Sequence, residues 1–203
     1  MTSEIHEAAP RRASTGGVDR PVAGGRVVSV PGSGMTIEVA PHRCFACGAL
    51  NEHGIHLDLH VDGDRCWTEL ALPDRFQGWD GIAHGGIICT ILDEVMAWSL
   101  AATDNWGLTA RMNVEFKRPV RLGVPIRGEG WTSATRRRII DTAAHIVDLT
   151  TGDVLATATG TYVAADAERK RELQARYRFR LTGAGAEAAR TAAGATPGNG
   201  NAG

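Results

Sequence analysis

The longest continuous hydrophobic pattern in the chain runs from His84 to Trp98. Two glycines follow the histidine, and large apolar side chains then fill nearly every side of a helix, a composition typical of helices buried inside a protein. We therefore predict a long buried helix that starts after His84 and ends near Thr103. Two adjacent carboxylates, Asp93 and Glu94, interrupt it. A buried carboxylate is costly unless it is paired, hydrogen-bonded or used for chemistry.

Alternating apolar and polar positions predict strands on both sides of this helix. Before it, residues 55–61 and 66–72 form two strands joined by a turn at Asp62-Gly63-Asp64. After it, we expect strands at 109–117, 126–134, 140–149 and 154–163, the last two joined by a turn at 150–153. In 109–117, one face carries Ala110, Met112, Val114 and Phe116, and the other carries Thr109, Arg111 and Asn113.

Two strands, one long helix and four strands joined by short turns indicate an α+β protein. Its antiparallel sheet has to cover one apolar face, and we expect it to wrap around the central helix. We predict a single domain over residues 35–180, with disordered tails at 1–34 and 181–203 because both ends are rich in Gly, Ala, Pro, Ser or Thr. Within the domain, residues 166–180 predict a charged surface helix after the last strand.

Composition excludes several classes of partner. The 203 residues carry 22 basic and 23 acidic side chains, which favours neither nucleic acid nor an anionic membrane. No apolar run is long enough to cross a bilayer, and no apolar segment follows Arg11-Arg12 to make an export signal. Four cysteines without such a signal indicate a reduced, cytoplasmic protein.

Four short motifs carry a resemblance to a known family: CFACG at 44–48, GIAHGG at 81–86, Asp93, and FKRPV at 116–120. With the order of elements, they resemble the hotdog fold, and more narrowly the PaaI-type acyl-CoA thioesterases and the related thioesterase superfamily. The resemblance implies hydrolysis of an acyl-CoA or acyl-carrier-protein thioester without a cofactor. It also implies a homodimer with the site at the interface, and leaves open whether dimers pair into tetramers.

Helix geometry fits such a shared site. His84 and Asp93 are nine positions apart, which places them on opposite sides of a continuous helix and about 13 Å apart along its axis. One subunit therefore cannot easily bring both to one substrate. In a two-fold dimer, the helix start of one chain can face the middle of its partner's helix.

The resemblance implies a role for each residue. The Gly85 amide, at a helix start with outward positive charge, would polarise the thioester carbonyl and stabilise the oxyanion. Asp93 would be the general base for water or the nucleophile, and sequence does not separate these routes. Thr109 would hold the attacking water, or be an ordinary strand threonine. His84 would order the turn or contact substrate, and Gly86 would lie beside substrate or allow close helix–sheet packing.

Substrate binding involves further residues. Several relatives carry an Asn six positions before the HGG histidine, where this chain has Gly78. Orientation of the substrate would then come from Gln77 or Asp80. Asn113, on the polar face of its strand, is a further candidate, and Arg118 is a candidate ligand for nucleotide phosphates unless it only keeps a strand end soluble.

The sequence also allows other interpretations. Cys44 and Cys47, with His53 and His56 downstream, suggest zinc, but one CxxC without a second pair at suitable spacing is a weak signal, so we expect no metal. Hotdog proteins also include dehydratases, whose catalytic His and Asp pair we do not find. A non-catalytic acyl-CoA-binding protein is the other alternative, because a fold does not guarantee an activity.

Overall fold

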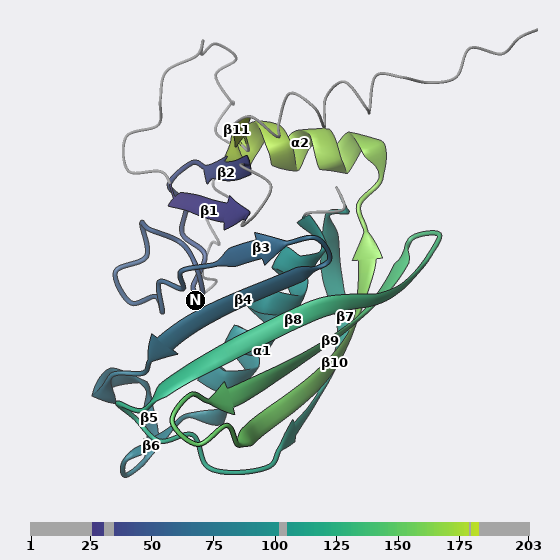
Figure 1. Ribbon diagram of the computed structural model, residues 1–203. Coiled ribbons are helices and arrows are strands. Elements are labelled where there is room, and N and C mark those ends of the chain that lie inside the picture. Colours follow the sequence, from purple (N-terminus) through teal and green to yellow (C-terminus); the bar gives the residue numbers. More distant parts are fainter. Residues whose placement is uncertain (1–25, 31–34, 102–104, 179, 183–203) are drawn as a thin grey trace, which may run out of the picture.

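The computed structural model describes residues 26–30, 35–101, 105–178 and 180–182. Within them, nine strands form one sheet in the order β11-β2-β1-β3-β4-β8-β9-β10-β7 (Figure 1). Paired strands run antiparallel, except that β1 meets β3 in parallel. The strands are β1 Arg26–Val30, β2 Met35–Val39, β3 His60–Asp62, β4 Arg65–Ala71, β7 Gly107–Phe116, β8 Pro125–Arg136, β9 Ile139–Asp148, β10 Val154–Ala164 and β11 Arg180–Thr182.

The remaining elements lie at the edges and on one face of this sheet. The central helix α1 spans Gly85–Ser99, and a second helix, α2, spans Ala167–Tyr177. A 3-10 turn at Asp74–Phe76 and a two-stranded sheet of β5 Gln77–Trp79 and β6 Ile82–Ala83 precede α1. Figure 1 shows α1 behind the curved sheet. The predicted α+β arrangement of a mainly antiparallel sheet around one long helix is therefore confirmed.

Helix α1 packs on β8 at very short range. Its inner face is fully buried through Ile88, Ile91, Leu92, Val95 and Met96, and burying each such side chain contributes about 1.5–3 kcal/mol. In β8, a Cβ placed on Gly130 would lie 2.7 Å from the Met96 nitrogen. Glycine at this position therefore lets the helix backbone approach the sheet.

The strand predicted at 55–61 is mostly wrong as a strand, although its alternation is right. Only its last two residues fall in β3. Ile55, Leu57 and Leu59 are buried and the residues between them exposed. However, the amides of Ile55 and Leu57 donate to the carbonyls of Phe45 and Ala46 at 2.8 and 2.9 Å. The 41–51 loop thus supplies the acceptors that a neighbouring strand would otherwise provide.

Helix α1 ends at Ser99 rather than near Thr103, which lies outside the described residues. The Ser99 hydroxyl donates to the Met96 carbonyl at 2.7 Å. The next amide, that of Leu100, donates to Ala97 at 3.3 Å, which tightens the last turn. The fully buried Leu100 side chain then anchors the segment as it leaves the helix.

Both predicted tails include residues, next to the domain, that form strands. The stretch RVVSV at 26–30, within the expected 1–34 tail, forms β1 and pairs with β2. At the other end, β11 pairs with β2 inside the expected 181–203 tail. Three valines in five residues give β1 a β-forming composition that its glycine-rich neighbours obscured. The rest of both predicted tails lies outside the described residues.

The remaining predicted elements are confirmed within a few residues. The turn at Gly63 joins β3 to β4, and that at Gly152 joins β9 to β10, each glycine at positive φ. Helix α2 follows the last long strand as a solvated helix without buried residues, and Asp166 caps it by accepting from the Arg169 amide at 2.8 Å. Neither helix in the described part of the chain has the length and apolar character needed to cross a bilayer.

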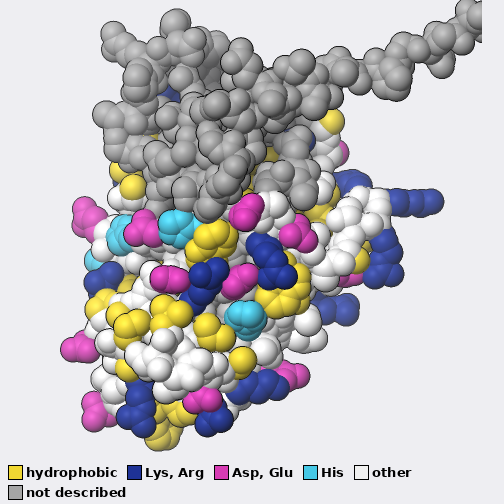
Figure 2. All heavy atoms as spheres, in the orientation of Figure 1, with side chains coloured by type: hydrophobic (Ala, Val, Ile, Leu, Met, Phe, Trp, Pro, Cys, Tyr) yellow, Lys and Arg dark blue, Asp and Glu magenta, His cyan; other side chains and the backbone are white. Residues whose placement is uncertain are grey.

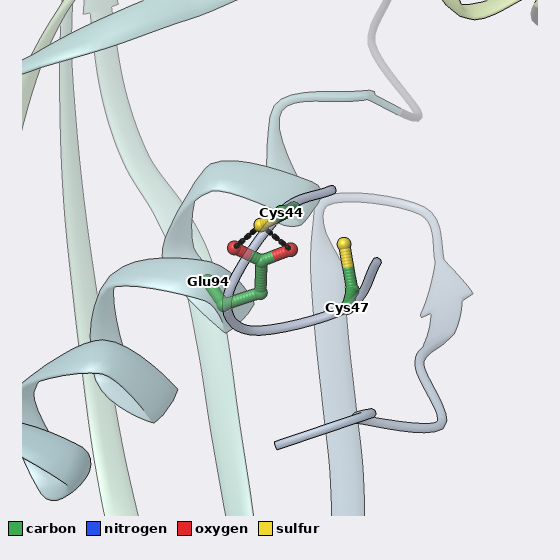
Figure 3. A group of neighbouring side chains, drawn as sticks. All are labelled: Cys44, Cys47 and Glu94. Atoms are coloured by element: carbon green, nitrogen blue, oxygen red, sulfur yellow. Dashed lines mark hydrogen bonds between the residues drawn. The ribbon is translucent and has the colours of Figure 1, made fainter. Parts of the chain in front are cut away.

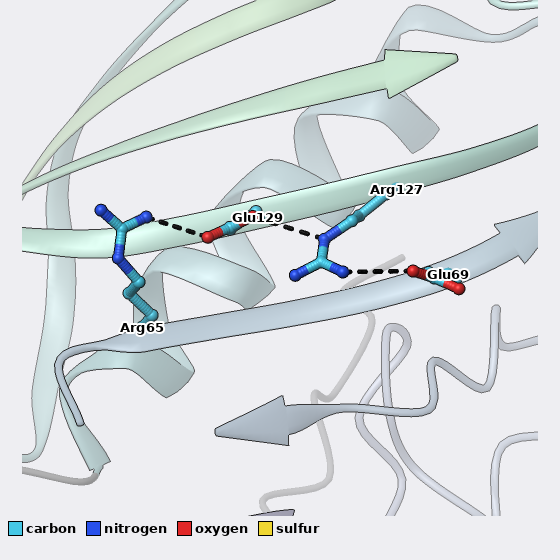
Figure 4. A network of polar contacts seen from close by, with 4 residues as sticks. All are labelled: Arg65, Glu69, Arg127 and Glu129. Carbon is cyan, nitrogen blue, oxygen red and sulfur yellow. Dashed lines mark hydrogen bonds and ion pairs between the residues drawn. The ribbon is translucent and has the colours of Figure 1, made fainter. Parts of the chain in front are cut away.

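The sheet face turned away from α1 carries charges of both signs among hydrophobic side chains (Figure 2). Two arginines and two glutamates alternate across β4 and β8 as a ladder (Figure 4). Its ion pairs are Arg65–Glu129 at 2.9 Å, Arg127–Glu129 at 3.3 Å and Arg127–Glu69 at 3.2 Å. These pairs lie at the protein surface and are partly exposed, so each contributes at most about 1 kcal/mol and the ladder mainly keeps this face polar.

Candidate active site

Asp93 lies in the middle of α1, and its carboxylate is held by two hydroxyl groups. Thr109 Oγ1 donates to Asp93 Oδ1 at 2.9 Å, and the Tyr162 hydroxyl donates to the same oxygen at 2.7 Å. Tyr162 also lies 3.0 Å from the main-chain oxygen of Asp93. Both side-chain bonds reach Oδ1, so Oδ2 accepts no hydrogen bond from the described residues. The carboxylate is therefore fixed in direction and keeps one oxygen available for chemistry.

A β-bulge brings Thr109 to this carboxylate. Arg111 lies opposite Thr161, whereas the next residue of β10, Tyr162, lies opposite Thr109, so Ala110 is the extra residue. The bulge turns Thr109 to the inner side of the sheet, towards α1. The predicted shared face of Thr109, Arg111 and Asn113 is therefore wrong: Asn113 lies opposite the exposed Thr159, on the outer side.

Tyr162 was not predicted as a site residue. Its side chain is fully buried, and burial together with the Asp93 charge raises the pKa of its hydroxyl. It consequently stays protonated and acts as a donor. A signal was present in the sequence: Tyr162 shares the inward face of β10 with Ala156 and Ala158, and a buried tyrosine hydroxyl needs a partner.

Glu94 points to a different part of the molecule. It accepts from Trp98 Nε1 at 2.9 Å and lies 3.8 and 3.9 Å from the Cys44 sulfur (Figure 3). Burial, and then the charge of Cys44, raise the pKa of Glu94 to about 7. A hydrogen bond from the Cys47 thiol lowers the pKa of Cys44 to about 5, whereas the pKa of Cys47 is raised. Glu94 therefore makes contacts with the 41–51 loop and with its own helix.

His84 caps α1. Its Nδ1 accepts from the Gly86 amide at 2.9 Å, and its own amide donates to Phe76 at 2.8 Å. This geometry supports the turn-ordering role of His84. The packing role suggested for Gly86 is wrong, because Gly86 is exposed and a Cβ there would meet the His84 ring at 3.0 Å rather than the sheet.

The Gly85 amide is the first of the helix, and helix geometry gives it no acceptor within α1. Gly85 lies in a shallow hollow beside Phe116, whose Cζ would be 3.5 Å from an added Cβ. The hollow is also lined by Ile88 and by residues 117–120. Among these, Arg118 forms a 3.6 Å ion pair with Asp153. Asp93 and Thr109 do not line this hollow, so one chain keeps its helix start and its carboxylate apart.

The loop before α1 is shaped by close contacts. A Cβ on Gly78 would lie 2.9 Å from the His84 Cα, so an asparagine in this place would displace the turn. Gln77 Oε1 accepts from the Gly81 amide at 2.9 Å and thus orders the loop. Asp80 is exposed, and no contact in the described residues ties it to Asp93 or Gly85.

The four side chains that suggested zinc in the sequence do not all lie together. Within the described residues, Cys44, Cys47 and Glu94 place their ligand atoms within 4.8 Å of one another. His53 and His56 do not belong to this group. The sequence pointed to the two cysteines but not to a carboxylate 50 positions away.

Comparison with known proteins shows which family the chain is similar to. Residues 80–155 match the family model of the thioesterase superfamily. A crystal structure of a thioesterase superfamily protein is 26% identical, with a TM-score of 0.56 and 60% of each chain covered, so the match spans less than two thirds of that relative. Zebrafish thioesterase superfamily member 2 is 14% identical, with a TM-score of 0.53, covering 57% of this chain and 89% of that one.

A Streptococcus mutans protein solved with bound acetyl-CoA is 17% identical, with a TM-score of 0.51, covering 58% of this chain and 97% of that one. At such identities, the zebrafish and streptococcal structures show the fold alone. A search of curated proteins found no match. The predicted resemblance to the thioesterase superfamily is thus confirmed, and the chain has the hotdog fold.

Proposed function

We propose that this protein is a thioester hydrolase that converts an acyl-CoA or acyl-carrier-protein thioester into a free acid and a thiol. The observation that carries the proposal is the Asp93 carboxylate, oriented by Thr109 and Tyr162 through one oxygen while the other is left for reaction. The thioesterase superfamily match and the acetyl-CoA bound to a streptococcal relative support the substrate class. The PaaI-type subclass stays a prediction.

Two routes use the same groups. In the first, Asp93 takes a proton from water, the hydroxide adds to the thioester carbonyl, and the C–S bond breaks to release the thiol with that proton. In the second, Asp93 adds to the carbonyl, the thiol leaves, and water hydrolyses the resulting anhydride. In both routes the Gly85 amide donates to the carbonyl oxygen as negative charge develops on it.

A homodimer would bring these groups together, and β7 supports this assembly. It is the last strand of the sheet and pairs only with β10 among the described strands. Leu108 and Phe116 on it are 72% and 56% exposed. An exposed edge strand with large apolar side chains is a surface that proteins normally pair or cover.

The direction of β7 fits a shared site. Its Thr109 end lies at Asp93 of its own chain, and its Phe116 end lies beside Gly85. If two copies of β7 pair antiparallel about a two-fold axis, the Phe116 end of one chain meets the Thr109 end of the other. Gly85 of one protomer then approaches Asp93 of its partner, as the sequence analysis expected.

Hydrolysis assays test the reaction. With acyl-CoAs of graded length and aromaticity, we expect the wild type to release free CoA and Asp93→Asn to lose at least about a hundredfold in kcat. Glu94→Gln is the matched control, because it removes the neighbouring charge yet keeps an acceptor for Trp98, and its rate should stay within a few-fold of wild type. No hydrolysis of any thioester by the wild type, with CoA still bound, would favour the non-catalytic alternative.

Mixed dimers test the shared site. Gly85→Pro removes the amide proton at the first helical position, which tolerates proline, and His84 has the extended ψ of 133° that precedes proline well. We expect it to lose about 10²–10³-fold in kcat, and Gly85→Ala, which keeps the amide, to lose little. Exchange of Gly85→Pro with Asp93→Asn subunits should restore about a quarter of the wild-type activity, since half of the dimers then hold one intact site. If no activity returned, the site would lie within one chain.

A further inference from the structure

A group of sulfur and oxygen atoms lies beside α1, on a different side of the helix from the proposed catalytic carboxylate. Figure 3 shows the Cys44 sulfur directly above the Glu94 carboxylate, with the Cys47 sulfur beside them on the same loop. The three ligand atoms lie within 4.8 Å of one another. None of these residues is needed for the proposed hydrolysis.

The 44–48 turn is built to aim both sulfurs inward. A Cβ on Gly48 would lie 2.4 Å from the Cys44 nitrogen and 2.5 Å from the His42 carbonyl, so only glycine fits. The Gly48 amide donates to the Cys44 carbonyl at 2.9 Å. Cys47 is buried and Cys44 is half-buried, so the turn holds both sulfurs away from open solvent.

The imidazole of His42 completes the surroundings. Its Nδ1 accepts from the Cys44 amide at 3.3 Å, which places the ring proton on Nε2. That nitrogen lies 3.9 Å from the Cys47 sulfur and so donates to it. His42 is therefore suited to hold the Cys47 sulfur by a hydrogen bond without binding the metal itself. Such outer-shell partners orient the ligands of many metal ions. Trp98 does the same for Glu94 through its 2.9 Å hydrogen bond.

The spacing of the Cys44 sulfur and the Glu94 oxygens is close to that of two ligands on a tetrahedral metal. With zinc–ligand bonds of about 2.0–2.3 Å, neighbouring ligands in a tetrahedron are about 3.5–3.8 Å apart. The Cys44 sulfur is 3.8 and 3.9 Å from the two Glu94 oxygens. A closure of a few tenths of an ångström would thus bring sulfur and oxygen onto one ion.

We propose that Cys44, Cys47 and Glu94 bind one zinc ion that fastens the 41–51 loop to α1. Two thiolates with a carboxylate select zinc over magnesium or calcium, which prefer oxygen ligands alone. A dication also balances three acidic groups that are crowded in a partly buried space. Cys44 and Cys47 line a small cavity together with His42, Trp98 and Tyr177, and a water molecule held there would supply the fourth ligand. The site does not depend on the proposed thioester hydrolysis.

A disulfide is the competing use of a CxxC pair. It would join the two sulfurs without any part for Glu94, which comes from a distant helix, or for the proton donor His42. Glu94 and His42 converging on the same two sulfurs favour a metal. The experiment therefore distinguishes metal binding from oxidation.

Metal analysis of the full chain tests the site. Purified under reducing conditions and supplied with zinc, the wild type should retain about one ion per chain after desalting. Cys44→Ser and Cys47→Ser should each weaken zinc binding by more than about a hundredfold, and His42→Ala by about 10–100-fold, the range for outer-shell partners. Cys89→Ser, a cysteine elsewhere on α1, is the matched control and should bind like the wild type.

Cobalt gives a second measurement that needs no variant. Added to the wild type, it should produce the near-ultraviolet charge-transfer absorption of thiolate ligands and the visible bands of a tetrahedral site, both displaced by zinc. The proposal is overturned if the reduced wild type binds neither ion, or if Cys89→Ser loses as much zinc as Cys44→Ser. Binding no metal while forming a Cys44–Cys47 disulfide in air would assign the pair to redox chemistry instead.

Discussion

Asp93 and Glu94 are adjacent in sequence, yet they lie in contrasting surroundings. Asp93 faces β7 and β10, where two hydroxyl groups donate to one of its oxygens. Glu94, about 100° further round the helix, faces the 41–51 loop, where an indole and a cysteine sulfur surround it. Both carboxylates interrupt the same apolar run, and the sequence alone gives little basis to separate them.

The difference shows how the surroundings decide what a carboxylate in a helix can do. Hydroxyl donors on one oxygen orient Asp93 and leave it reactive towards a substrate. Burial beside a thiolate raises the pKa of Glu94 to about 7 and makes it a partner for sulfur or for a metal. We therefore expect changes around Asp93 to alter the rate of hydrolysis, and changes around Glu94 to alter stability and metal content.

Among changes to the surroundings of the two carboxylates, the largest effect should come from removing both donors to Asp93. Thr109→Val and Tyr162→Phe each delete one hydrogen bond of about 1–1.5 kcal/mol, so each should lower kcat about five- to tenfold. The double variant should lose up to about a hundredfold with little change in KM, because the carboxylate loses its orientation rather than its substrate. Tyr177→Phe is the control. A double variant as fast as the wild type would show that the orientation of Asp93 is unimportant.

On the Glu94 side, Trp98→Phe removes the indole donor and part of a buried side chain. We expect the free energy of unfolding to fall by about 1–3 kcal/mol, measured by urea denaturation, while kcat stays within a few-fold of wild type. If Trp98→Phe stayed folded but lost as much kcat as Tyr162→Phe, the surroundings of Glu94 would also affect hydrolysis, and the proposed difference between the two carboxylates would be wrong.

The smallest effect is a pH dependence at Tyr162. Because its pKa is raised in the folded protein above the ordinary value of 10.0, the folded state keeps a proton that the unfolded chain releases. The stability due to this group is complete below pH 10 and is lost as the pH rises above it. Between pH 10 and 11, the wild type should lose about 1 kcal/mol more than Tyr162→Phe in urea titrations. If the free energy of unfolding fell equally with pH in the wild type and in Tyr162→Phe, the folded protein would not be holding this hydroxyl in its neutral form.

The sequence predicts the order of elements because period-2 and helical patterns are local. The helix start at His84 and the strand that holds Asn113 follow from such patterns. What local patterns do not contain is a bulge. The extra residue at Ala110 changes which side of β7 Thr109 occupies, and nothing in the run of residues marks it. The Thr109–Asp93 contact is consequently visible only in three dimensions.

Contacts between residues far apart in the chain could not be predicted from the sequence for a related reason. Glu94 and Cys44 meet because a loop folds over α1, and no spacing rule links positions so far apart. The same applies to Tyr162, which approaches Asp93 from the far end of the chain. The family resemblance pointed to Asp93 and Gly85, and the three-dimensional contacts add the groups that hold or surround them.

The bulge decides which side of the strand a hydroxyl faces without any change of residue type. If β7 alternated regularly from Arg111 back to Thr109, both side chains would lie on the outer face and Asp93 would lack this donor. Removal of Ala110 would instead leave Thr109 next to Arg111 and opposite Tyr162, so its hydroxyl would stay on the inner side. Among related chains, a threonine near this point is therefore not enough to hold the carboxylate, because its spacing from the outward residues of the strand decides where its hydroxyl lies.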